Sequence, residues 1–309
     1  MLAAELIRRQ NIDVLCLTFA TPFFGAEKAQ AAAKQINLPL AVEDITNQHL
    51  KMLKSPRYGY GKNMNPCIDC HILMLQEAGK KMVESGADFI FTGEVLGQRP
   101  MSQGKQSLYV VAKNSGFPDY ILRPLSAQLL EPIKAEREGK VDRSRLLSIS
   151  GRSRKEQMQM ATDFGITHYA PPAGGCLLTD SMFTRRLRDL FTHQADHDIH
   201  DLELLKYGRH FRADDQGKII VGRNNSDNEK LRGLATDNDL VLFMADFPGP
   251  HVVVPHGIEA LLPLAASLCV RYSDAPVDRE ANVICQYKKS SKTIKAQAAA
   301  KEDCERWII

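Results

Sequence analysis

The sequence has no run of eighteen apolar residues, which is about the length that a helix needs to cross a membrane. Its N-terminus also lacks the basic, apolar and small-residue order of a signal peptide. No internal repeat or low-complexity block is apparent. We therefore expect a cytoplasmic protein with no membrane partner.

The composition is that of a globular protein, with 44% hydrophobic and 25% charged residues. A length of 309 residues allows two domains, each with its own core. A net charge of +3 permits an RNA partner without demanding one. The seven cysteines are odd in number and widely scattered, which argues against a disulfide framework and favours a metal or catalytic use.

The hydrophobic pattern changes along the chain and predicts two domains. Residues 1 to about 125 alternate helical and strand patterns, which is typical of βαβ units in a parallel sheet. From about residue 200, short β-type runs are separated by Asn, Asp, Gly and Pro. We predict an α/β domain with a doubly wound parallel sheet over residues 1–198, and an α+β domain over residues 199–309.

Three cysteines stand in loop contexts. Cys67 and Cys70 follow the Gly-containing stretch "SPRYGYGKNMNP" and fall in the first turn of a predicted helix, where the helix dipole favours thiolates. Cys176 follows two prolines and two glycines in "YAPPAGGC", which leave a sulfur accessible. The other four cysteines lie in apolar patterns or near the end of the chain, and are interpreted as core or incidental residues.

The spacing of these cysteines leaves several kinds of site open. A structural zinc ion needs four ligands, and His71, next to Cys70, would point elsewhere on a helix. Cys67, Cys70 and Cys176 could instead hold an iron–sulfur cluster with one open position, or include a pair that carries a persulfide. Buried, unreactive thiols are the remaining alternative.

The run "FTGEVLGQRPMSQ" followed by "ILRPL" resembles a segment of the 4-thiouridine synthases, which are PP-loop ATP pyrophosphatases that thiolate tRNA. The "NPCIDC" and "GGC" segments are similar to the cysteine segments of tRNA 2-thiouridylases. The resemblance covers residues 1 to about 195. It implies an ATP-dependent tRNA sulfurtransferase with Mg²⁺-bound ATP, a tRNA substrate and a sulfur donor, either a cysteine desulfurase relay or sulfide.

The same resemblance implies roles for individual residues. ATP would adenylate a uridine oxygen, and a sulfur nucleophile would then displace AMP. Thr18 and Phe19 would lie beside the adenine, with Gly93 and Gln103 near the nucleotide. Glu94 and Arg99 are further candidates for contact with phosphates or RNA. The implied catalytic residues are Cys67 and Cys176, and the implied ligands of a [4Fe–4S] cluster are Cys67, Cys70 and Cys176.

The sequence departs from this family in one respect. Family members begin with a strand and a Ser-Gly-Gly-x-Asp-Ser loop that cradles pyrophosphate, and no such loop occurs in the 309 residues. The absent strand would be the central one of the sheet, so two apolar strands would lose their partner. We hypothesise that the true start lies upstream of Met1. The alternative is a non-catalytic RNA-binding protein with a vestigial nucleotide domain.

Four segments between residues 205 and 296 resemble, in the same order, the RNA-binding module of the NFACT proteins. They are "KIIVGRNNSDNEKL", "DLVLFMADFPGPHVVVP", "LAASLCVRYS" and "VICQYKKSSKTIKA". The sequence has "VLFM" where that module has Trp-Phe-His. The expected RNA contacts are donors from Arg223, Asn224 and Asn225, and phosphate contacts from a basic edge. That edge comprises Lys288, Lys289, Lys292 and Lys295, for which a solvated strand edge is the alternative interpretation.

Overall fold

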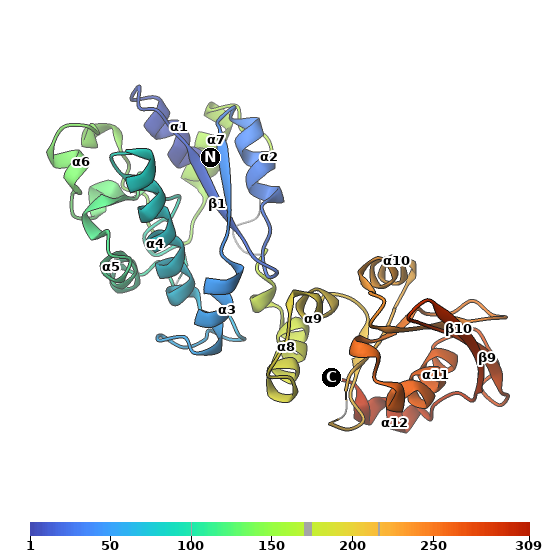
Figure 1. The fold of residues 1–309 in the computed structure, drawn as a ribbon. Coiled ribbons are helices and arrows are strands. Elements are labelled where there is room, and N and C mark those ends of the chain that lie inside the picture. Colours follow the sequence, from blue (N-terminus) through green and yellow to red (C-terminus); the bar gives the residue numbers. More distant parts are fainter. Residues whose placement is uncertain (100, 170–174, 216) are drawn as a thin grey trace. The chain divides into compact units, whose positions relative to one another are not determined.

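The computed structural model describes residues 1–99, 101–169, 175–215 and 217–309. These residues form two compact units, Met1–Thr179 (unit 1) and Asp180–Ile309 (unit 2) (Figure 1). Among them, no helix combines the length and the apolar character that crossing a membrane requires. Each unit has its own hydrophobic core, as the length of the chain predicts.

Unit 1 is a mixed α/β structure in which helices alternate with short strands. Its strands are β1 (Cys16–Ala20), β2 (Leu40–Asp44), β3 (Ile90–Phe91) and β4 (Ile121–Leu122). Its helices are α1 (Leu2–Arg8), α2 (Glu27–Gln35), α3 (Thr46–Lys54), α4 (Cys67–Ser85), α5 (Lys105–Asn114), α6 (Lys134–Arg137) and α7 (Lys155–Asp163). The alternating pattern of the sequence therefore predicted the class of this unit.

The predicted single doubly wound sheet is not found in the described part of unit 1. β1 pairs in parallel only with β2, and β3 pairs in parallel only with β4, giving two separate two-stranded sheets. The second edges of β1 and β3 both border one groove, lined by Leu17 and Phe19 on one side and by Ile90 and Phe91 on the other. The two pairs stay separate because no described strand lies between these edges to hydrogen-bond with both.

Helix α4 places the two cysteines of the CxxC segment. It begins after Pro66, which cannot supply a backbone donor, and ends at Gly86, whose φ of 67° lies in the left-handed region. The Ala87 N–H donates to the Met82 carbonyl at 3.0 Å and satisfies one of the last carbonyls. Leu75 is buried on the side of α4 that packs in the core. Cys67 and Cys70 therefore occupy the first turn, as predicted.

Unit 2 is built on a six-stranded antiparallel sheet in the order β10-β9-β7-β8-β6-β5. Its strands are β5 (Arg209–Phe211), β6 (Ile219–Val221), β7 (Leu240–Met244), β8 (Val252–Val254), β9 (Ala281–Tyr287) and β10 (Ser290–Ala296). Its helices are α8 (Ser181–His193), α9 (Ile199–Leu204), α10 (Asn225–Leu234), α11 (Leu262–Arg271) and α12 (Lys301–Trp307).

The two faces of this sheet are covered differently. Helix α11 packs on one face, where Leu242, Val252 and Val283 form the core. On the opposite face, which we call the outer face, Ile220 of β6 and Val253 of β8 pack in a cluster with residues of α9 and α10. The antiparallel sheet over residues 209–296 fits the α+β domain that the sequence predicted.

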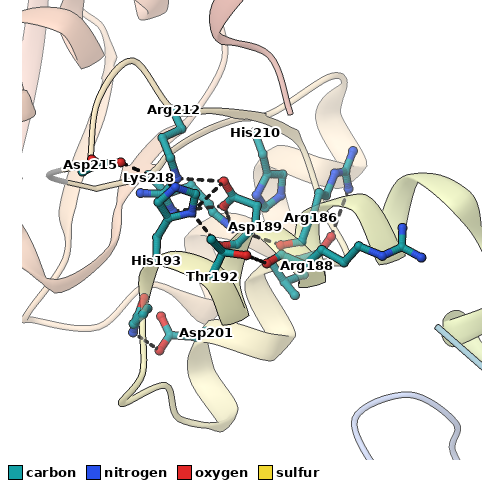
Figure 2. A network of polar contacts seen from close by, with 12 residues as sticks. Arg186, Arg188, Asp189, Thr192, His193, Asp201, His210, Arg212, Asp215 and Lys218 are labelled. Carbon is teal, nitrogen blue, oxygen red and sulfur yellow. Dashed lines mark hydrogen bonds and ion pairs between the residues drawn. The ribbon is translucent and has the colours of Figure 1, made fainter. Parts of the chain in front are cut away.

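Helix α8 belongs to unit 2, although the sequence placed it before a boundary at residue 198. Figure 2 shows the polar contacts that tie it there. The buried Arg186 donates to the carbonyls of Leu205 and Gly208, each at 3.0 Å. Asp189 accepts from Arg212 at 2.8 Å and pairs with Lys218 at 2.9 Å. These contacts join residues far apart in sequence, so the local pattern did not reveal them.

Candidate functional site

The cysteines of unit 1 approach one another at the N-terminal end of α4. Asn63, in the loop before α4, donates to the carbonyl of Thr179 at 2.7 Å and so joins that loop to the segment of Cys176. The Cys70 thiol lies near enough to Cys67 and Cys176 for their charges to raise its pKa. The structure therefore brings the three predicted residues into one region. Residues 170–174, which precede Cys176 in the Pro- and Gly-rich segment, lie outside the described residues.

Burial raises the pKa of two of these thiols, Cys70 and Cys176. It raises the pKa of Cys70 well above its usual range, and the charges of Cys176 and Cys67 raise it further. Burial also raises the pKa of Cys176 to about 11, although a backbone hydrogen bond from Leu178 lowers it. At Cys70 the expected stabilisation of a thiolate by the helix dipole is therefore outweighed by burial, and burial likewise favours the neutral thiol of Cys176.

The described residues, as placed, do not fit a metal centre. No group of three or more His, Cys, Asp or Glu side chains within them could hold a metal ion. His71, the residue considered as a fourth zinc ligand, instead contacts Glu94 through Nδ1 at 3.0 Å. The ligand set of Cys67, Cys70 and Cys176 stays a prediction, and no reaction step through a cluster is derived.

Glu94 forms a buried charged network at the end of β3. Its carboxylate accepts from Arg123 Nε at 2.9 Å and from Thr92 Oγ1 at 3.0 Å, in addition to its contact with His71. Burial alone would raise the pKa of Glu94, but the His71 hydrogen bond and the Arg123 charge lower it to about 2. Because its oxygens are engaged within unit 1, this carboxylate stabilises the fold.

The groove between β1 and β3 has a volume of about 510 Å³. Thr18, Phe19 and Gly93, three of the residues implied for ATP binding, line it. Gln103 does not line it, and is buried with a side-chain oxygen that has no partner among the described residues. The volume suits a nucleotide, but the sequence supplies no glycine-rich phosphate loop. Binding of ATP in this groove stays a prediction.

Two of the three residues predicted as RNA donors in unit 2, Arg223 and Asn224, contact Asp227 within the protein. Arg223 pairs with Asp227 through Nε, and the Asn224 side chain caps α10 by accepting from the Asp227 N–H at 2.9 Å. Asn225, the first residue of α10, is exposed. Arg223 therefore offers an RNA phosphate a charge that Asp227 already balances in part.

The predicted lysines fall at the β9–β10 hairpin. Lys288 and Lys289 form its two-residue turn, with φ values of 45° and 66°. The Lys288 ammonium lies 4.8 Å from the centre of the Tyr287 ring. Lys292 pairs in register with the buried Cys285 and so points to the α11 side of the sheet, whereas Lys295 lies on the outer face. The structure therefore separates Lys292 from Lys295.

Sequence reasoning missed a part of the outer face that α9 and α10 leave uncovered. We call it the open half, and it is formed by alternate residues of β7, β9 and β10. These residues are Val241, Phe243, Asn282, Ile284, Gln286, Ser291, Thr293 and Lys295. The alternation of buried and half-buried residues in "LVLFM" and "ANVICQY" is the signal that could have identified this face.

Comparison with known proteins identifies one domain. Residues 208–308 match the NFACT protein RNA binding domain, which confirms the resemblance drawn from four segments of the sequence. An RNA-binding domain is therefore present in unit 2. Nothing in the comparisons shows a thiolation domain of the PP-loop class, and no curated protein matches the chain.

Among solved structures, the chain is similar to the C-terminal part of the fibronectin/fibrinogen-binding protein from Streptococcus suis. The identity is 15%, the TM-score is 0.31, and the alignment covers 78% of this chain and 96% of that chain. A similarity of this size supports no argument about function.

Proposed function

We propose that the protein binds RNA through unit 2. The observation that carries the proposal is the match of residues 208–308 to an RNA-binding domain. The hairpin turn adds two exposed cations, Lys288 and Lys289, for which no ion pair occurs among the described residues. Cations of this kind neutralise phosphates and release counterions.

Salt-dependent RNA binding is the direct test of this proposal. The full-length protein is titrated into a fluorescent single-stranded RNA, and the anisotropy is followed at several salt concentrations. We expect the logarithm of the association constant to fall linearly with the logarithm of salt, by about 0.7 for each phosphate contacted. Absence of RNA binding at low salt would overturn the proposal.

A second candidate function is ATP-dependent tRNA thiolation with a sulfur donor. It is favoured by one observation, the approach of Cys67, Cys70 and Cys176 to one another in unit 1. In that function Cys67 and Cys176 supply the sulfur chemistry, and the RNA-binding domain delivers tRNA. The match of residues 208–308 supports RNA binding without catalysis better than it supports this reaction.

Replacing Cys176 by serine should abolish the thionucleoside that this reaction makes, because serine cannot carry a transferable sulfur. The measurement is mass spectrometry of tRNA nucleosides from a deletion strain carrying the variant gene. Cys16→Ser, a change at another half-buried cysteine of unit 1, is the matched control and should restore the thionucleoside. An undiminished level in the Cys176→Ser strain would remove this cysteine from the reaction.

A further inference from the structure

We propose that single-stranded RNA lies on the open half of the outer face, with a base stacked on Phe243 and phosphates at the Lys288–Lys289 turn and at Arg232. The proposal rests on the proposed RNA binding by unit 2 and assigns its surface. Of these residues, only the two lysines were expected from the sequence, and Lys292 is excluded from the surface.

The open half presents an aromatic ring among polar side chains. Phe243 is half-buried and pairs in register with Ile284, and its ring centre lies 5.5 Å from that of His251. Around it, Gln286 and Lys295 are exposed on the same face. A half-exposed ring on an uncovered sheet, flanked by hydrogen-bonding groups, is the arrangement on which unpaired bases stack.

A cavity of about 370 Å³ adjoins this face at the end of α10. Arg232 of α10 lines it together with Val241, Gln286 and Lys288. Its cations outnumber its available carboxylates. Asp239 is engaged with His200 at 2.9 Å and with Thr236, which leaves Asp237 as the one lining carboxylate with no such side-chain partner in the described part of unit 2. The cavity is large enough for part of a nucleotide and has the charge to hold its phosphate.

The turn residues supply an independent argument. Both positions of a two-residue hairpin turn with positive φ favour Asn-Gly or related pairs, because a side chain is strained there. Here both positions are lysines, with φ values of 45° and 66°. A turn that keeps two cations at strained positions is not optimised for stability, which points to a function for the charges.

The test uses the full-length protein and a fluorescent single-stranded RNA of about twelve nucleotides, within the range of site sizes of such folds. The double variant Lys288→Asn, Lys289→Gly relieves the turn, so its unfolding temperature should equal or exceed that of the wild type. Its RNA affinity should nevertheless fall, with a salt dependence shallower by about 0.7 for each lysine removed. A loss of RNA affinity without a loss of thermal stability would show that the lysine charges bind RNA and that the variant is still folded.

Stacking is tested with Phe243→Leu, which keeps an apolar side chain but removes the ring. The affinity should fall by about fivefold or more, while Phe243→Tyr should bind like the wild type. Two lysines of β10 test which face of the sheet binds RNA, because Lys292 and Lys295 lie on opposite faces of this strand. Lys295→Gln should weaken RNA binding, and Lys292→Gln should not.

The outcomes show separately whether the protein binds RNA and whether it does so through the open half. If the wild type binds RNA but the turn variant and Phe243→Leu bind equally well, the surface is overturned and RNA binding stands. Equal losses for Lys292→Gln and Lys295→Gln, or equal competition by duplex RNA, would also overturn it. If the wild type binds no RNA, the proposed function and the surface fail together.

Discussion

Replacing Glu94 by alanine should lower the free energy of unfolding of unit 1 by about 3–5 kcal/mol, the usual cost of breaking a buried charge pair. The substitution leaves the Arg123 guanidinium buried without its carboxylate. The measurement is denaturant unfolding followed by far-ultraviolet circular dichroism. Unit 2 provides an internal reference, because Trp307 is the only tryptophan of the chain and its fluorescence reports on that unit alone.

The pH dependence of unit 1 gives a second readout of the same carboxylate. The pKa of Glu94 falls from its ordinary value of 4.5 to about 2 in the folded protein. Its contribution to stability is therefore present above about pH 4.5 and is lost as the pH falls toward 2. Glu94→Ala should lack this loss, whereas Glu84→Ala, at an exposed carboxylate on α4, should retain it. Equal stability of Glu94→Ala and the wild type would contradict the role of this network.

Replacing Asp189 by alanine should destabilise unit 2 by a similar amount, about 3–5 kcal/mol. The buried Lys218 and the largely buried Arg212 would then lose their shared carboxylate (Figure 2). Burial raises the pKa of Asp189, but the Arg212 hydrogen bond and the Lys218 charge lower it below its ordinary value. Unfolding followed by Trp307 fluorescence measures the effect.

A surface pair in the same unit is the matched control. Glu305 Oε1 lies 3.8 Å from Lys301 Nζ, and both side chains are exposed. Glu305→Ala should therefore change the free energy of unfolding by less than about 0.5 kcal/mol. If Asp189→Ala altered only the unfolding of unit 1, helix α8 would not belong to unit 2.

The sequence predicted where helices and strands occur better than it predicted how many residues each strand contains. The patterns "ADFIFTG" and "DYILRPL" were expected to be strands, and the structure forms them over only Ile90–Phe91 and Ile121–Leu122. β3 and β4 pair only with each other, and their ladder covers only two residues of each run. The domain boundary was displaced for another reason, because Asp189 and Arg186 make contacts that local periodicity does not reveal.

The candidate sites were predictable to different degrees. The approach of Cys176 to Cys67 and Cys70 followed from the resemblance, since no local pattern links positions so far apart. Arg223 and Asp227 are four residues apart on the sequence, a spacing that predicts an ion pair at the start of a helix. From the sequence, Arg223 was instead interpreted only as a donor to RNA. Hairpin register decides which lysines share a face, and the sequence alone left the register open.

Photo-crosslinking of RNA to the full-length protein, followed by mass spectrometry of the attached peptides, tests the central claim most directly. We predict crosslinks within residues 208–308, including peptides that contain Phe243 and the Lys288–Lys289 turn. Crosslinks confined to residues 1–179 would contradict an RNA-binding surface on unit 2.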